Sequence, residues 1–96
     1  MLDFFKFKTM KLDKYKVNWI HNKELGTTTC IIKKWETKEL IAVGVSIKHP
    51  NDSYNKAVGR KVSLGKAMWV ADCPKEQRKK IWSDYFKQVK GNINVN

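Results

Sequence analysis

The chain has 96 residues and carries 20 Lys or Arg against 9 Asp or Glu, which gives a formal net charge of +11. This length allows one domain, and the 42% hydrophobic content is too high for a disordered basic tail. The sequence contains neither a run of about 18 apolar residues nor a signal-peptide pattern. We therefore expect no membrane span and no secretion, and we expect the protein in the cytoplasm.

The positive charge has two explanations. All basic residues except Arg60 and Arg78 are Lys, and Lys, Asn and Ile are the residues that AT-rich genomes encode most readily. Codon usage and solubility therefore account for part of the charge. The remainder favours attraction of phosphate groups over base-specific recognition, because the latter relies on the Arg side chain.

The first half of the chain alternates apolar and polar residues with the period of a β-strand. Phe5 and Phe7 alternate with lysines within residues 1–12, which we interpret as a short strand or a loose arm. The alternation resumes over residues 14–48 and predicts a β-meander. The short polar connection at residues 36–39 makes its last two segments an antiparallel hairpin.

The segment from Leu40 to Lys48 has two unlike faces. One face carries the small residues Ala42, Gly44 and Ser46, and the other carries a branched stripe of Ile41, Val43, Val45 and Ile47. Small residues on one face indicate an element packed closely against it, and this pattern favours a central strand.

Pro50 ends the strand pattern, and a period of 3.6 residues follows. We predict a helix over residues 53–70, capped by Asn51, Asp52 or Ser53. Gly65 lies in its apolar arc, where a missing side chain allows close approach to the sheet. The full arc comprises Tyr54, Ala57, Val58, Val62, Leu64, Gly65, Met68 and Trp69.

A second helix is predicted over residues 74–90, with Pro74 in its first turn and Gly91 at its end. Residues 91–96 are expected to form a mobile tail. Residues 1–96 thus predict a single α+β domain, in which an antiparallel β-meander of three to four strands is followed by two α-helices packed on it.

Residues suited to metal binding or catalysis are sparse. Cys30 and Cys73 lack the spacing of a metal site, and no phosphate-binding loop or nucleophile elbow is present. His49 and Asp52 are close enough in sequence for an acid–base pair, but a strand end and a helix cap explain them better. We expect no metal, no cofactor and no enzymatic activity.

Two basic groups are candidates for binding phosphates, although a solvated surface explains them equally well. One group lies on the predicted solvent face of the first helix. The other begins the second helix, and it extends the positive surface if the two helices pack side by side. Lys61 instead falls in the apolar arc, where its ammonium must reach solvent, pair with an anion or face a ligand. Lys33, which shares a strand face with Ile31 and Trp35, raises the same question. The candidate nucleic-acid- or nucleotide-binding residues are Lys56, Arg60, Lys61, Ser63, Lys66, Arg78 and Lys79.

The stretch from Lys48 to Met68, KHPNDSYNKAVGRKVSLGKAM, contains the pattern P-x-D-x-[FY]-N-K-x-x-G-R-K. It resembles a hairpin-and-helix segment of small uncharacterised proteins from phages and prophages of AT-rich Gram-positive bacteria. The resemblance covers about a fifth of the chain. It implies a phage origin and action in the cytoplasm of the infected host bacterium, and it carries no catalytic residues.

The resemblance supplies no biochemical activity, but small phage proteins commonly bind and block host or defence machinery. Together with the lack of catalytic residues, this favours a non-catalytic host-takeover or anti-defence protein that acts by stoichiometric binding through a basic surface. Such a protein acts as an anti-CRISPR protein on a ribonucleoprotein, or as a sponge for an anionic signalling nucleotide. The alternatives are a nucleic-acid-binding accessory protein of phage replication and a direct inhibitor of a host enzyme. The expected partner is therefore a host or defence protein, a ribonucleoprotein, a nucleic acid or a nucleotide. A domain this small also gains stability by forming a homo-oligomer.

Overall fold

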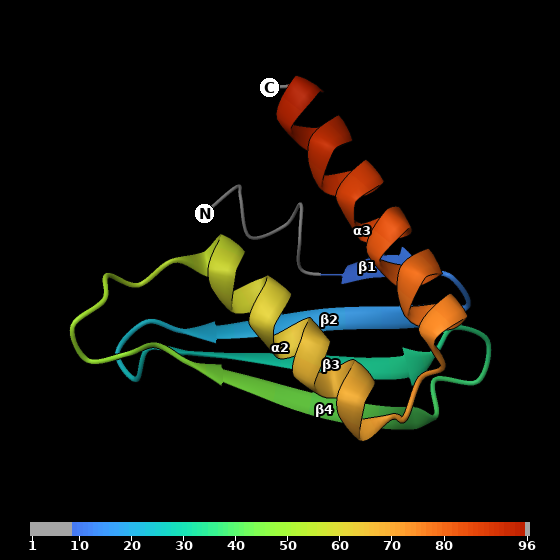
Figure 1. Ribbon diagram of the computed structural model, residues 1–96, viewed down its shortest axis with the longest axis horizontal. Coiled ribbons are helices and arrows are strands. Elements are labelled where there is room, and N and C mark those ends of the chain that lie inside the picture. Colours follow the sequence, from blue (N-terminus) through green and yellow to red (C-terminus); the bar gives the residue numbers. More distant parts are fainter. Residues whose placement is uncertain (1–8, 96) are drawn as a thin grey trace.

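The computed structural model describes residues 9–95, with side chains described as far as residue 90. Figure 1 shows an antiparallel sheet followed by two helices. This is the α+β meander that the sequence predicts; Phe5 and Phe7 lie outside the described residues. The elements are β1 (Thr9–Leu12), β2 (Tyr15–Asn22), β3 (Thr27–Lys34), β4 (Leu40–Ile47), α2 (Lys56–Val70) and α3 (Lys75–Val95).

Consecutive strands are neighbours in the sheet, in the order β1-β2-β3-β4. Short turns join them: Asp13 and Gly26 have φ angles of 56° and 67°, in the left-handed region that tight turns use. In the register of the sheet, Trp19 lies opposite Cys30, and Cys30 lies opposite Gly44. The prediction that residues 40–48 form a central strand was wrong, because β4 is an edge strand of the described sheet.

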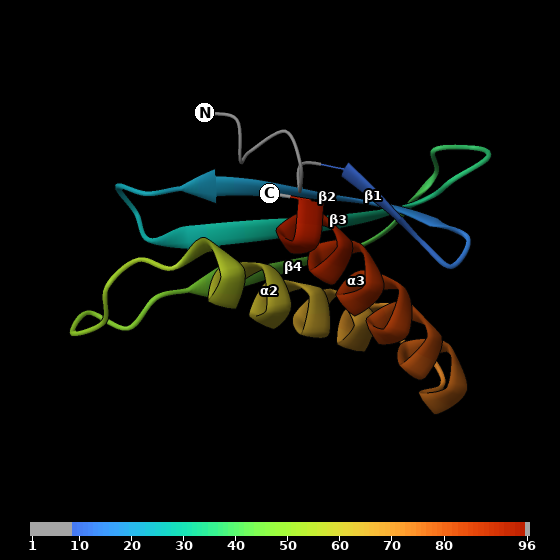
Figure 2. The ribbon, with the colours of Figure 1, turned by 90° about the horizontal axis from the view of Figure 1, so that it is seen from above.

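Both helices lie on the same face of the sheet (Figure 2). That face carries the apolar core, and the opposite face, which no described element covers, is called the open face below. The core residues are Met10, Leu12, Val17, Trp19, Cys30, Ile32, Leu64, Ala67, Met68, Cys73, Ile81 and Tyr85. Burial of these side chains is the main favourable contribution to folding.

Helix α2 packs on β3 and β4 through glycines. A Cβ atom at Gly44 would overlap the backbone of Ser63 and Ala67, and one at Gly59 would overlap the Thr28 side chain. The small face of β4 was correctly predicted to contact a closely packed element. Gly65 was expected to make the close approach on the helix side, but a Cβ there would meet only Trp82, at 3.9 Å.

The ends of α2 are defined by two polar residues. The Asn55 side chain caps the helix by accepting a hydrogen bond of 3.1 Å from the Val58 N–H. This position corrects the predicted cap at residues 51–53, so the helix begins at Lys56. At the other end Asp72 has a φ of 56°, and the N–H of Cys73 donates to the Met68 carbonyl, which closes the helix in a Schellman motif.

Helix α3 lies across β1 and the turn that follows it. Ile81 and Tyr85 are buried, and the Tyr85 ring centroid lies 5.8 Å from that of Trp19. The Asp13 N–H donates to Asp84 at 2.8 Å, so a side chain of α3 holds the β1–β2 turn. The helix continues beyond the predicted end at Gly91 to Val95, since a glycine weakens a helix by only about 1 kcal/mol.

Candidate functional site

The predicted phosphate-binding face of α2 does not exist as one surface. Arg60 is 8% exposed and Ser63 is fully buried, and the Ser63 hydroxyl donates to the Gly59 carbonyl at 2.7 Å. Lys61, expected in the apolar arc, is exposed. The helix is rotated from the predicted orientation because the side that packs on β4 is the one with small residues, rather than the one with the most apolar surface.

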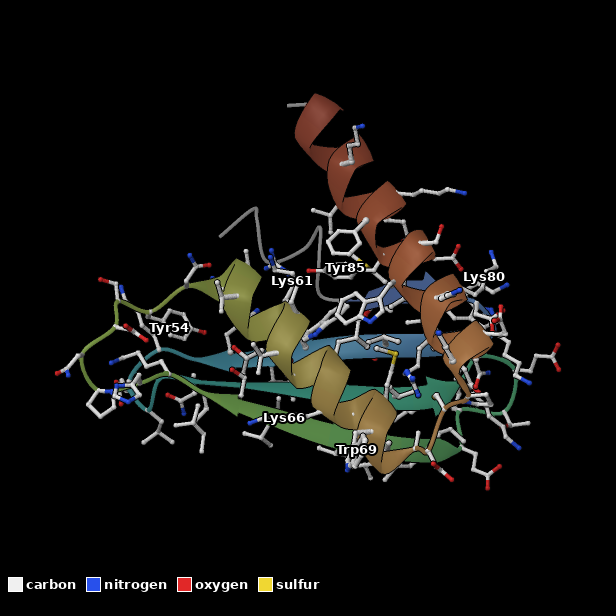
Figure 3. The ribbon with its side chains drawn as sticks, viewed as in Figure 1. Tyr54, Lys61, Lys66, Trp69, Lys80 and Tyr85 are labelled. Carbon is white, nitrogen blue, oxygen red and sulfur yellow. The ribbon has the colours of Figure 1, made fainter. Side chains whose placement is uncertain are left out.

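The remaining predicted residues are exposed but point in different directions. Lys61 and Lys66 lie on opposite sides of α2, as Figure 3 shows, and Lys56 begins the helix. Arg78 and Lys79 are exposed near the start of α3, which follows the other end of α2. The two helices diverge from their junction in Figure 1, so they do not pack side by side along their length.

Buried Arg60 lies close enough to His21 to lower the pKa of that histidine. The ring of His21 shares a hydrogen bond of 2.9 Å with the Thr28 hydroxyl. Burial, together with the positive charges of Arg60 and Lys56, lowers the pKa of His21 from 6.5 to about 4. His21 is therefore neutral in the folded protein at pH 7, whereas the unfolded chain takes up a proton below pH 6.5.

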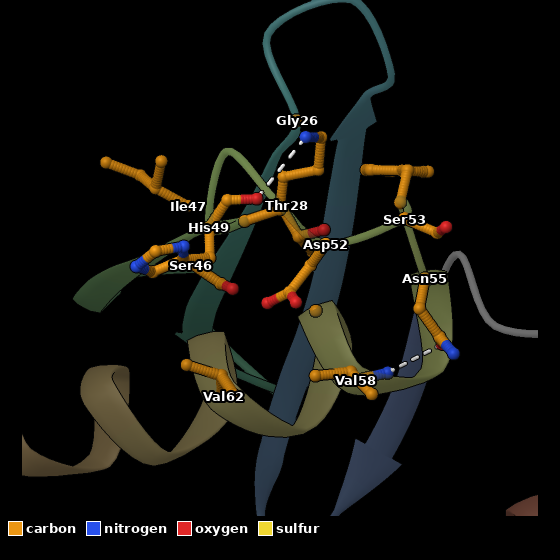
Figure 4. A pocket seen from close by; sticks show the side chains of 13 residues that line it. Gly26, Thr28, Ser46, Ile47, His49, Asp52, Ser53, Asn55, Val58 and Val62 are labelled. Carbon is orange, nitrogen blue, oxygen red and sulfur yellow. Dashed lines mark hydrogen bonds between the residues drawn. The ribbon is translucent and has the colours of Figure 1, made fainter.

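A pocket of about 520 Å³ lies between α2 and the loop that follows β4 (Figure 4). Its polar groups hold the loop together: the Asp52 N–H donates to the His49 carbonyl at 3.0 Å, and Asn55 caps α2. His49 and Asp52 thus form the predicted turn, while the cap is Asn55. Within the described residues no hydrogen bond joins the two side chains, so the pocket presents no paired acid and base.

Other reactive groups serve structural roles. Cys30 and Cys73 are free thiols, and burial raises the pKa of each, which opposes formation of a nucleophilic thiolate. The described residues contain no group of three or more His, Cys, Asp or Glu suited to a metal ion. Among the described helices, none is long and apolar enough to cross a membrane.

The open face of the sheet carries a row of lysines. Lys11 on β1 lies opposite Lys16 on β2, and Lys16 lies opposite Lys33 on β3. These three residues, called the lysine row, alternate with the buried residues Leu12, Val17 and Ile32 and therefore project from the open face. Like charges directly opposite each other destabilise a sheet, and none of the three forms an ion pair with a described residue.

An aromatic pocket lies beside this row. The pocket, of about 410 Å³, is called the Trp35 pocket and is lined by Lys11, Lys14, Tyr15, Lys34, Trp35, Glu36, Thr37 and Ile41. The Nζ atoms of Lys11 and Lys38 lie 5.3 and 4.7 Å from the Trp35 ring centroid, which is within cation–π range. Tyr15 is held in place by Gln77 of α3, whose side-chain amide donates to the Tyr15 hydroxyl at 2.7 Å.

Sequence reasoning identified Lys33 on the same strand face as Trp35 but missed Lys11 and Lys16. Their alternation with apolar residues is visible in the sequence, and it could have indicated that both project from one face. Their alignment depends on the register of three strands, which one sequence does not provide. Comparison of the chain with protein-family models, curated proteins and solved structures finds no significant match.

Proposed function

We propose that this protein is a non-catalytic binding protein that holds a single-stranded nucleic acid on the lysine row and in the Trp35 pocket. The observation that carries the proposal is the alignment of Lys11, Lys16 and Lys33 across three strands. A row of neighbouring ammonium groups that has no acidic partner among residues 9–95 is costly by itself, and phosphate groups offset that cost.

The charge balance around the pocket supports an anionic ligand. Lys14, Lys34 and Lys38 add three further ammonium groups near Trp35. Of these, Lys34 is paired with Glu39 at 3.2 Å, and both side chains are more than half exposed. Such an exposed pair contributes little to stability. The lysines around the pocket outnumber the carboxylates of Glu36 and Glu39, so the local potential is positive.

The aromatic group supports a single strand rather than a duplex. Unstacked bases bind without sequence preference by stacking on aromatic rings, while neighbouring lysines contact the phosphates. Trp35 is half-buried, and the ammonium groups of Lys11 and Lys38 lie over its ring. A base that stacks on Trp35 would displace at least one of these ammonium groups from the ring, and the displaced lysine would then be close enough to contact the phosphate of that base. The scarcity of Arg agrees with binding that does not depend on base sequence.

Fluorescence anisotropy with labelled single-stranded RNA and DNA, measured over a range of salt concentrations, tests this function. We expect affinity to fall as salt rises, with a slope of about 0.7 per phosphate contact in a plot of log K against log salt. The double variant Lys16→Gln/Lys33→Gln should flatten that slope by about 1.4. Trp35→Ala should lower affinity roughly tenfold, and Trp35→Phe should restore much of the loss by stacking.

The matched control is Lys61→Gln/Lys66→Gln, which removes the same charge from α2. We expect it to lower affinity far less than the sheet variant. An equal loss of affinity in the two double variants would show that net charge attracts the oligonucleotide without a site on the sheet. That result would contradict the proposal. Absence of oligonucleotide binding in low salt would also refute it.

The cellular role follows from the resemblance to phage-encoded proteins, and we propose it on that basis alone. A stoichiometric anti-defence protein could use this surface to occupy the RNA of a defence ribonucleoprotein. Binding of a mononucleotide as tight as that of an oligonucleotide would instead favour the signalling-nucleotide sponge. An accessory role in phage replication predicts binding to single-stranded DNA, which the same titration measures.

A further inference from the structure

Strand β4 forms an edge of the described sheet that lacks the usual protection against pairing with another strand. Its eight residues, Leu40–Ile47, include no charged residue and no proline, although the chain as a whole carries a net charge of +11. Proteins commonly protect an exposed edge strand with lysines, prolines or bulges, because unpaired backbone groups attract another strand. The irregularity in the β3–β4 pairing lies between Ile32 and Lys33 and therefore at one end of β4, so the rest of the edge is regular.

The free backbone groups of this edge can be identified from the register. Lys48 lies two residues beyond Ser46, and its N–H donates to the Gly26 carbonyl at 2.8 Å. Because hydrogen-bonded pairs alternate in an antiparallel ladder, the backbone groups of Ser46, Gly44 and Ala42 also face β3. Those of Val43, Val45 and Ile47 face away from the sheet, and no other strand of the described part of the chain pairs with them.

Helix α2 adds apolar side chains on the same side of the molecule. Trp69 is 83% exposed and Val62 is 41% exposed, and a turn of helix separates each from Lys66. Figure 3 shows Trp69 and Lys66 on the β4 side of α2. An exposed Trp beside an uncharged strand edge is typical of an interface centre.

We propose that two copies of this chain associate through β4, which pairs antiparallel with β4 of the second copy around a two-fold axis. Charge selects this occupant. Two copies that each carry +11 repel one another, and strand β4, which has no charged residue, is where two sheets can approach at the lowest electrostatic cost; Lys66, on the β4 side of α2, is the charge that remains beside it. A nucleic acid would gain nothing from an uncharged edge. The inference does not depend on the proposed function.

The pairing would create one continuous sheet of eight strands, with both α2 helices on the same face and Trp69 and Val62 facing the axis. A Trp buries about 150–250 Å² when fully covered, so the two Trp69 side chains alone could bury on the order of 300 Å². The rest of the roughly 1,200–2,000 Å² of a standard interface would come from the two β4 strands, Val62 and Val70.

Sedimentation equilibrium of the full-length protein over a range of concentrations and salt tests the proposal. We expect a species of twice the 11.3 kDa chain mass, and its association should strengthen as salt rises because repulsion is screened. Binding to a nucleic acid has the opposite salt dependence, so failure of either proposal can be recognised separately.

Variants locate the interface. Val45→Pro removes an N–H that faces the free edge and leaves the β3 ladder intact, so it should abolish the dimer, whereas Val45→Thr should not. Val62→Lys should weaken association at least tenfold and leaves the sequence of β4 unchanged. It therefore tests the interface even if the Val45→Pro variant fails to fold. Ile20→Lys, on the open face of β2, distinguishes edge pairing from stacking of open faces.

We expect Ile20→Lys to leave the dimer unchanged. A monomer at all concentrations and salts would overturn the proposal. A dimer that Ile20→Lys disrupts while Val62→Lys leaves it intact would equally overturn it, since the open faces would then form the contact.

Discussion

The contact between α2 and Gly44 makes a sharp prediction about stability. A Cβ atom introduced by Gly44→Ala would lie 2.9 Å from the Ala67 Cα atom and closer still to the Ser63 carbonyl oxygen and the Ala67 nitrogen. All three are backbone atoms, so no change of rotamer relieves the overlap. The helix must move away from the sheet by about 0.6–1.1 Å for the contact with the Ala67 Cα atom to reach an ordinary carbon–carbon separation of about 3.5–4.0 Å.

The loss of stability follows from the gap that this movement opens between the helix and the sheet. Leu64 and Met68 are almost fully buried beside the contact, and burial of each stabilises the fold by about 1.5–3 kcal/mol. A gap of 0.5–1 Å forfeits roughly a quarter to a half of the dispersion energy of the atoms concerned. Together with a typical overpacking cost of about 1–3 kcal/mol, we expect Gly44→Ala to destabilise the protein by about 3 kcal/mol.

Thermal unfolding followed by circular dichroism measures this effect. For a domain of this size about 3 kcal/mol corresponds to a fall in Tm of roughly 12–24 °C. The matched control is Gly65→Ala, whose Cβ would meet only Trp82 at 3.9 Å. That variant should be more stable than the natural protein by about 1 kcal/mol, because Ala favours a helix. A Tm of Gly44→Ala within a few degrees of that of the natural protein would refute the close-packing argument.

Two further predictions concern His21 and Asn55. Because the folded-state pKa of His21 is depressed, stability should be full above pH 6.5 and fall as the pH drops from 6.5 towards 4, by about 1–2 kcal/mol after allowance for partial exposure. Urea unfolding in this window should show that His21→Gln removes this pH dependence, whereas exposed His49→Gln keeps it. Asn55→Ala should lower the free energy of unfolding by about 1 kcal/mol through loss of the helix cap, and Ser53→Ala, at a predicted but unused cap, should change it by less than about 0.5 kcal/mol.

The sequence by itself determined the architecture. Alternation over residues 14–48 predicted three strands of the meander, and the polar turns predicted their antiparallel pairing, because both signals depend on neighbours along the chain. The small residues on one face of β4 also predicted that another element packs closely against it. The predicted fold, a meander followed by two helices packed on it, is the one observed.

Only the tertiary structure decided which side of α2 is buried. Hydropathy favoured the arc that contains Val62 and Trp69, whereas the sheet accepts the side that contains Gly59, Ser63 and Ala67. The reason is steric: at Gly44 the backbones of strand and helix approach so closely that only small side chains fit between them.

The lysine row also depends on the tertiary structure, because its three residues come from three different strands. Each lysine occupies an ordinary polar position of its own strand, and the row exists only because the register of β1, β2 and β3 aligns the three residues. Periodicity along a chain determines which face a residue occupies. Its neighbours across the sheet are determined by pairing between strands, so the candidate site emerges only in the folded molecule.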